Sequence, residues 1–282
     1  MFPQERKSMF YLGTADGGRN DLTQITYHKL IRGDVKPITL WLVEHRGKIP
    51  NVGDWIEKFP SIESLYVSRD LIPFTKSNLA FLKSFIIRDF CDEGLSAKFQ
   101  EHSWQADQIL PNVKFYGCLD QKSIDLVGMK PRNLPSLEWL ECSLDEKNKV
   151  LDIISGFESL TALSLGNTRN QDLFEVMKNK LKVLNLEILT RGFPLWKIAD
   201  QTNLEILRIN GYAGLNMEWL LDLSLKEIQL FNCSNVTNAE TLLEMMQLES
   251  LTVVSCRKAL SKELKLKLKE RELHFLDIDY SG

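Results

Sequence analysis

The chain repeats one short pattern of apolar and polar positions, L-x-x-L-x-L, from residue 35 almost to its end. Apolar residues that alternate with polar ones over so few positions are typical of a half-buried strand. The pattern can be aligned eleven times, beginning at residues 35, 62, 82, 113, 137, 160, 181, 204, 225, 248 and 273. The last seven intervals lie between 21 and 25 residues, which predicts one strand and one connection in each repeat.

The clearest repeat runs from Leu225 to Met246 and predicts a strand, a tight turn and a helix. Thr237 and Glu240 have the spacing of a capping box, in which the hydroxyl and the carboxylate each accept from a backbone amide at the helix start. Apolar residues then follow at helical spacing: Ala239, Leu242, Leu243 and Met246.

Other connections also carry apolar residues at helical spacing and are expected to pack as outer helices. They cover residues 149–157, 172–177, 195–199 and 217–223. The insertion at residues 94–110 is the longest and predicts a full helix. Pro60, Pro111 and Pro135 stand just ahead of strands, where a helix must stop.

Residues 1–34 do not fit the repeat. Phe10 to Leu12 and the alternating Leu22–Leu30 segment flank the turn-rich GTADGGRND, which is typical of a β-hairpin. A solenoid needs an atypical end unit to cover its first open core face, so we predict an N-terminal capping hairpin region at 1–34 and a repeat solenoid at 35–282. The alternative, a phosphate-binding loop, lacks the Lys-Ser/Thr of a P-loop and the G-x-G-x-x-G pattern.

The L-x-x-L-x-L template resembles the leucine-rich repeat superfamily. In the repeats at 225 and 248 it resembles the cysteine-containing type, with C-x-x-(V/I)-T after the first of these strands. This resemblance implies an α/β fold, a curved horseshoe with a parallel concave β-sheet and outer helices, in about eleven units. It also implies protein recognition by a curved, non-catalytic scaffold.

The third, fifth and seventh residues of each template should project from the concave sheet, because side chains alternate along a strand. Exposed aromatic residues interleaved with one sign of charge are what a protein-binding surface looks like. The acids lie in the second half of the chain, so the partner is expected to be basic. The predicted partner-binding residues are Tyr66, Trp139, Glu141, Glu187, Arg208, Glu227, Phe231, Phe275, Asp277 and Asp279.

Composition and motifs narrow the possible functions further. A net charge of −3 gives no reason to expect nucleic acid or an anionic membrane as partner. The charged N-terminal residues do not read as a secretory signal, so a cytoplasmic location is expected. The four histidines form no metal or catalytic motif, and no cofactor, metal or small-molecule substrate is expected. The basic segment 262–272 is expected to be a solvated outer segment rather than a membrane or nucleic-acid element.

The five cysteines lack the spacing of a disulfide framework. Cys118 and Cys142 fall on the last apolar template position and should point into the core. Cys233 and Cys256 occupy one later position in successive repeats, about 4.8 Å apart if the strands stack. Two buried small hydrophobic residues, a disulfide and a metal site are all compatible with that spacing.

Two functions compete. The first is an inhibitor or immunity protein that sequesters a basic, nuclease-like toxin or enzyme. The second is a substrate-recognition adaptor of a larger signalling or ubiquitin-ligase complex, with a second docking site near Asp16–Asp21. Catalysis has no motif in its support. For either function, the concave face competes with the 94–110 insertion as the contact surface.

Overall fold

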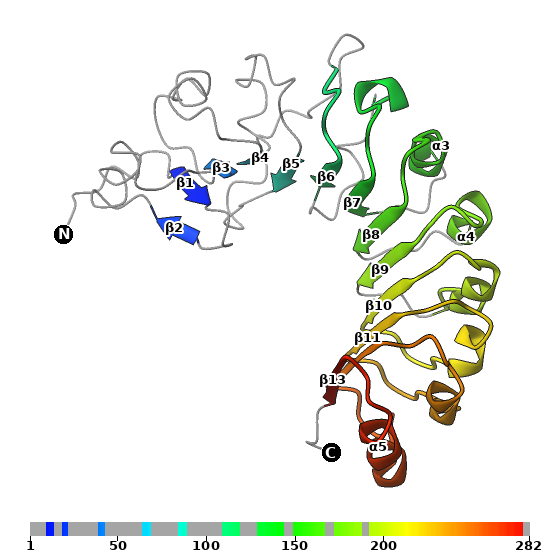
Figure 1. Ribbon diagram of the computed structural model, residues 1–282. Helices are drawn as coiled ribbons and strands as arrows, with labels where there is room; N and C mark the ends of the chain where they lie inside the picture. The colour runs from blue at the N-terminus through cyan, green and yellow to red at the C-terminus, as the bar shows by residue number, and fades with distance from the viewer. Residues whose placement is uncertain are drawn as a thin grey trace. The chain divides into compact units, whose positions relative to one another are not determined.

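The computed structural model (Figure 1) describes residues 109–118, 129–143, 149–166, 172–187 and 192–278, together with strand residues 10–13, 19–21, 39–42, 64–68 and 84–88. The chain forms two compact parts. We call residues 1–137 with 157–159 the N-terminal part, and residues 138–156 with 160–282 the C-terminal part.

The N-terminal part begins with antiparallel strands. Strand β1 (Phe10–Gly13) pairs with β2 (Arg19–Asp21) and with β3 (Thr39–Leu42). A hairpin therefore closes over the predicted turn, although its second strand is β2. The predicted Leu22–Leu30 strand lies outside the described residues, and the division at residue 34 stays a prediction.

Strands β3 to β6 are parallel and show that the first template was aligned two residues too early. They continue with β4 (Ser64–Ser68), β5 (Ser84–Arg88) and β6 (Phe115–Cys118). Thr39 pairs with Ser64, the third residue of its template, so the first repeat begins at residue 37 and not at 35. Trp41 consequently takes the fifth position, opposite Tyr66.

In the C-terminal part, seven parallel strands follow one another in chain order, as the predicted leucine-rich repeat fold requires. In each neighbouring pair that the register gives, third template positions face third positions and fifth face fifth. The strands are β7 (Trp139–Ser143), β8 (Ala162–Gly166), β9 (Val183–Glu187), β10 (Ile206–Asn210), β11 (Glu227–Phe231), β12 (Ser250–Val254) and β13 (Phe275–Ile278).

The core consists of the first, fourth and sixth template positions. In the repeats that begin at 137 to 248, these side chains are at most 4% exposed. Full burial of one leucine or isoleucine contributes roughly 1.5–3 kcal/mol, so the stacked apolar rows are the main stabilising term. Leu273 and Leu276 in the last repeat are only half-buried, whereas Ile278 is buried. Cys142 lies in this core as predicted.

Short helices form the connections and lie along one side of the C-terminal strands (Figure 1). Several are 3₁₀ helices, whose rise of about 2.0 Å per residue spans a short connection with few residues. The helices are α3 (Lys149–Ser155), α4 (Leu173–Val176), η4 (Leu195–Asp200), η5 (Met217–Leu220), η6 (Ala239–Leu243) and α5 (Lys262–Lys269), with η3 (Pro131–Asn133) in the N-terminal part.

The predicted capping box at Thr237 is wrong. The residue that precedes η6 is Asn238, in the left-handed conformation at φ 54, and its side chain caps no amide. The backbone of Thr237 instead pairs with the preceding repeat, where its amide donates to Leu215 and its carbonyl accepts from Met217. Met246 is also misplaced, since it is 85% exposed while Met245 is buried. The predicted 94–110 helix lies almost wholly outside the described residues.

The segment predicted to be solvated begins as helix α5. Ser261 caps it by accepting from the Leu264 amide at 3.1 Å. Leu264 and Leu268 share one buried face, because residues four apart lie on the same side of a helix. Arg271 then reaches back and donates to the carbonyls of Leu242 and Met245, at the C-terminal end of η6. The repeat that begins at 248 is therefore attached to the repeat that begins at 225 by helix packing and by the Arg271 guanidinium.

After each of three successive strands, the chain turns through two left-handed residues placed three apart. The pairs are Gly211 with Gly214, Asn232 with Asn235, and Ser255 with Lys258. This conformation lets the backbones of adjacent turns form hydrogen bonds. For example, the Gly214 amide donates to the Ser234 carbonyl at 2.8 Å. The turn geometry is thus shared by these three repeats, although the residues that adopt it differ.

Gly214→Ala should destabilise the protein by about 1 kcal/mol, because a Cβ is unfavourable at a left-handed position. The φ of Gly214 is +85 and an added Cβ would meet nothing within 4 Å, so the loss comes from the backbone and not from a clash. Gly214→Asn is the matched control and should lose less, since asparagine occupies the equivalent position at 235. Urea denaturation measures both variants; equal losses would contradict the backbone explanation.

Candidate protein-binding surface

The sheet face opposite the buried rows carries three parallel rows of side chains, which we call the open face. The third-position row is Trp139, Ala162, Val183, Ile206, Glu227, Ser250 and Phe275; the fifth-position row is Glu141, Ser164, Asn185, Arg208, Gln229, Thr252 and Asp277; the described seventh-position row is Gly166, Glu187, Asn210, Phe231 and Val254. Because the register is parallel, successive members of one row lie about 4.8 Å apart.

Three of the predicted residues meet at the centre of the open face. Arg208 Nη2 lies 3.7 Å from Glu187 Oε1, and the guanidinium carbon lies 4.9 Å from the ring centroid of Phe231. One cation is thus held between a carboxylate on β9 and an aromatic face on β11, an arrangement worth about 0.5–1 kcal/mol at a solvated site. Arg208 is therefore neutralised within the chain.

The fifth-position row leaves two polar atoms without a hydrogen bond beside this cluster. Asn185 Nδ2 donates to Ser164 Oγ at 2.9 Å, whereas Asn185 Oδ1 is buried and accepts no hydrogen bond within the described residues. The neighbouring Arg208 Nε is likewise buried and donates to no acceptor there. These two polar atoms are thus available to hydrogen-bond a water molecule or a group of another molecule.

Trp139 is 40% exposed and begins an apolar strip that the sequence reasoning missed. The strip consists of Trp139, Ala162, Val183 and Ile206, which are successive members of the third-position row. A prediction based only on aromatic and charged residues overlooks the aliphatic ones. A comparison of the third template position in successive repeats finds them, because the parallel register places these positions side by side.

The acidic character of the open face is present in the described residues. Four carboxylates belong to it, Glu141, Glu187, Glu227 and Asp277, against the single guanidinium of Arg208. Gln229 donates its side-chain amide to Glu227. Phe275 and Asp277 lie at the far end, about 29 Å from Trp139 by six strand spacings of about 4.8 Å. The predicted residues therefore share one face but do not form one pocket.

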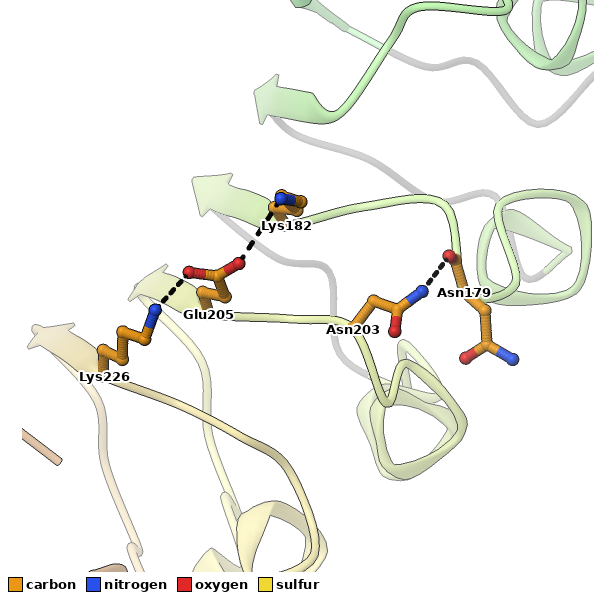
Figure 2. A network of polar contacts seen from close by, with 5 residues as sticks. All are labelled: Asn179, Lys182, Asn203, Glu205 and Lys226. Atoms are coloured by element: carbon orange, nitrogen blue, oxygen red, sulfur yellow. Dashed lines mark hydrogen bonds and ion pairs between the residues drawn. The ribbon is translucent and has the colours of Figure 1, made fainter. Parts of the chain in front are cut away.

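A ladder of opposite charges borders the open face along the second template position (Figure 2). Glu205 pairs with Lys226 at 2.7 Å and with Lys182 at 3.6 Å, and His274 Nδ1 lies 3.6 Å from Glu249. The backbones of these residues form a ladder too, since the amide of Lys226 donates to Glu205 and that of Glu205 to Lys182, both at 2.8 Å.

The Glu205–Lys226 pair of this rim favours the charged form of both side chains. Hydrogen bonding to Lys226, with the lysine charges, lowers the pKa of Glu205, and hydrogen bonding to Glu205 raises the pKa of Lys226. Exposed pairs of this kind contribute little stability. Their consequence is electrostatic. Because positive and negative charges alternate along this rim of second-position residues, the rim adds little net charge. The net charge of the open face is therefore set by the three rows of the face itself.

The outer side of the same repeats also exposes apolar side chains. They lie on or beside helices that pack against one another in chain order. The exposed residues are Val176, Trp196, Leu221, Met246 and Leu266. Trp196 is partly covered by Lys197, whose Nζ lies 5.8 Å from the ring centroid. Exposed apolar surface is thus not confined to the open face.

Two predicted binding residues cannot be placed. The side chain of Tyr66 and all of Asp279 lie outside the described residues. The other eight project from the open face as the template predicts, and whether they bind a partner stays a prediction.

Cys233 and Cys256 occupy equivalent places just after β11 and β12, as predicted. The Cys233 amide donates to Cys256 Sγ at 3.2 Å, and both cysteines are free thiols. Across the described ranges, no three His, Cys, Asp or Glu side chains gather as a metal site would require. Nor does any helix within those ranges combine the length and apolar character that a bilayer crossing demands.

No family model matches the chain, and no curated protein matches it. Solved structures that it resembles include internalin C2 from Listeria monocytogenes, with 13% identity, a TM-score of 0.39, and coverage of 78% of this chain and 80% of that one. Another Listeria monocytogenes internalin has 14% identity and a TM-score of 0.40, with 94% and 91% covered. A leucine-rich repeat protein from Leptospira interrogans has 14% identity and a TM-score of 0.44, with 89% and 68% covered.

The fold assignment rests on the chain itself. In the described residues from β7 onward, apolar residues at the first, fourth and sixth template positions fill the core, parallel strands recur every 21 to 25 residues, and a short helix lies in each connection. With these features the protein is a leucine-rich repeat solenoid.

Proposed function

We propose that this chain is a protein-binding scaffold whose open face captures a basic partner protein, and that it acts as an inhibitor that sequesters a cationic enzyme such as a nuclease toxin. The observation that carries the proposal is the excess of carboxylates on the open face, inside a rim that balances its own charge.

Charge complementarity explains why the partner should be basic. Arg208, the single described cation of the three rows, is engaged by Glu187 and Phe231. Glu227 and Asp277 therefore face solvent with no cation beside them in those rows. A face with one sign of charge accelerates encounter with a partner of the opposite sign and disfavours partners of like sign.

The apolar strip supplies what charge alone does not. Interface energy concentrates in a few aromatic and charged anchors, while neighbouring contacts mainly exclude water. Trp139 stands at one end of the strip, with Val183 and Ile206 half-exposed along it. A partner with an apolar surface that packs against this strip would place its basic side chains close to the carboxylates of the neighbouring rows.

The proposal can be tested by site-specific photocrosslinking in cells that express the protein. A crosslinker at Val183 on the open face should capture a basic protein, whereas one at the exposed Lys178 on the outer side should not. The captured protein, purified and assayed alone, should lose its enzymatic activity when one equivalent of this chain is added. An acidic partner would contradict the charge argument, and an active 1:1 complex would exclude the inhibitor role.

Trp139→Ala should weaken binding of that partner by about 2 kcal/mol or more, as truncation of a central aromatic anchor does. Trp196→Ala removes a comparably exposed tryptophan from the outer side and serves as the matched control. Isothermal titration calorimetry measures both affinities. A larger loss for Trp196→Ala than for Trp139→Ala would move the binding site to the outer side.

Glu227→Lys should slow association and flatten its dependence on salt, because charges around an interface act chiefly on the association rate. Glu244→Lys makes the same charge change beside η6 on the outer side and should leave the association rate nearly unchanged. Stopped-flow kinetics at several ionic strengths separates the two variants. Equal slowing by both would show that net charge, and not the open face, guides the encounter.

A second candidate function is a recognition adaptor, which needs a docking surface besides the open face. The exposed apolar residues on the outer side favour it, above all Trp196, Met246 and Leu266. The same variants distinguish the two functions. An adaptor would lose one partner through Trp139→Ala and a different partner through Trp196→Ala, while an inhibitor would lose its single partner through Trp139→Ala alone.

A further inference from the structure

Two cysteines of successive repeats meet where strands β11 and β12 end. Each lies two residues beyond its strand, at the place that Tyr212 occupies in the repeat before. Cys233 is 1% exposed, whereas Cys256 is partly open to solvent. The pair therefore combines one accessible sulfur with one that only its neighbour can reach.

Hydrogen bonds converge on the accessible sulfur. The Cys233 amide donates to Cys256 Sγ at 3.2 Å, and Cys256 Sγ itself lies 3.4 Å from the carbonyl oxygen of Val254, to which its thiol donates. The inner sulfur lies among carbonyl oxygens, 3.5 Å from that of Phe231 and 3.7 Å from that of Ile209. The Cys233 amide favours the anionic form of Cys256, while the Val254 carbonyl favours its protonated form. Carbonyls likewise favour the protonated form of Cys233, against backbone hydrogen bonding from Tyr212 and Gly211 that lowers its pKa. The clearest difference between the two sulfurs is therefore their access to solvent.

The acidities of the thiols follow from these surroundings. Hydrogen bonding from the Cys233 thiol lowers the pKa of Cys256 to about 7, with a smaller lowering from the Cys233 amide that partial burial opposes. The hydrogen bond to Cys256, together with burial, raises the pKa of Cys233. Cys142 provides the contrast, because burial raises its pKa and the nearby Glu141 carboxylate adds to that rise.

We propose that Cys256 and Cys233 form a thiol–disulfide exchange site, in which Cys256 reacts with a low-molecular-weight disulfide and Cys233 then closes a bond between neighbouring repeats. The thiolate of Cys256 attacks one sulfur of the small disulfide, its S–S bond breaks, and one thiolate leaves. Cys233 then attacks Cys256 Sγ, the bond between that sulfur and the small thiol breaks, and the leaving thiolate takes up the Cys233 proton. The small disulfide is reduced to two thiols while the two cysteines are oxidised to one disulfide.

Repeat geometry allows the second step. Equivalent positions of stacked repeats lie about 4.8 Å apart, within the Cα separation of about 4.4–6.8 Å that disulfides span. The reaction also needs no exposure of Cys233, because its target is the neighbouring sulfur and not a molecule in solvent. The product would link the turns that follow β11 and β12, two residues beyond Phe231 and Val254 of the open face.

The probe is oxidised glutathione in excess, added to the native full-length protein at neutral pH. Free thiols are then alkylated under acid quench, and the sites are mapped by mass spectrometry. Digestion at glutamate separates the two cysteines, since Glu240, Glu244 and Glu249 lie between them. We expect glutathione on Cys256 at early times, replaced by a peptide linked through Cys233 and Cys256, with Cys142 unmodified throughout.

Two variants isolate the steps. Cys233→Ser should let the mixed disulfide on Cys256 accumulate, and Cys256→Ser should leave Cys233 unmodified. Modification of Cys142 as fast as Cys256 in the wild-type protein would overturn the proposal. A mixed disulfide that persists on wild-type Cys256 without a linked peptide would overturn it too. Partner binding enters none of these measurements, so the result is independent of the proposed function.

Discussion

The parallel register of the repeats is the constraint on which the rest of the structure depends. A single repeat cannot bury its own leucines, because they point across a thin unit and need stacked neighbours above and below. The register meets this need by placing first on first, fourth on fourth and sixth on sixth template positions. Leu273 and Leu276 are only half-buried, and in the described residues their repeat packs against one neighbouring repeat instead of two.

The same register gives the surface its chemistry. Residues that are distant in sequence become neighbours at one strand spacing, so each row acts as a linear array. Along the rim the array alternates in sign and neutralises itself, as Lys182, Glu205 and Lys226 illustrate. The open face has no such alternation, and its carboxylates outnumber its cation. The described residues of the open face therefore carry a net negative charge, whereas the rim is close to neutral.

The sequence was sufficient to place the strands, because a period of 21 to 25 residues with three buried positions leaves little freedom. All eleven templates fall on strands, although the first was aligned two residues early. Pro37 interrupts the apolar pattern of this repeat, and its register becomes clear only from its pairing with the next strand. The capping box at Thr237 failed for a related reason. Its backbone is recruited by Leu215 and Met217 of the preceding repeat, a contact about twenty residues away that no local motif reveals.

The candidate site was predictable to the same extent. Alternation correctly directed Trp139, Arg208 and Glu227 to one face, yet the Glu187–Arg208–Phe231 cluster depends on side-chain geometry between strands. The apolar strip was missed because a single aliphatic residue on a strand does not indicate a binding surface. Only the alignment of several such residues in one row does. Exposure of Met246 in place of Met245 reflects the tighter turn of η6, which shifts the buried side relative to an α-helix.

Stacking also makes the repeats chemically interdependent. Whatever occupies a position is met by the residue at that position in the next repeat, so Lys opposite Glu gives an ion pair, Ser164 opposite Asn185 gives a side-chain hydrogen bond, and Cys opposite Cys gives a thiol pair. Neighbours in direct contact commonly couple by about 0.5–3 kcal/mol, so a substitution in one repeat should be felt chiefly by the two that flank it. The open face and the thiol pair are therefore products of one geometric rule, and they differ only in which residues the rule brings together.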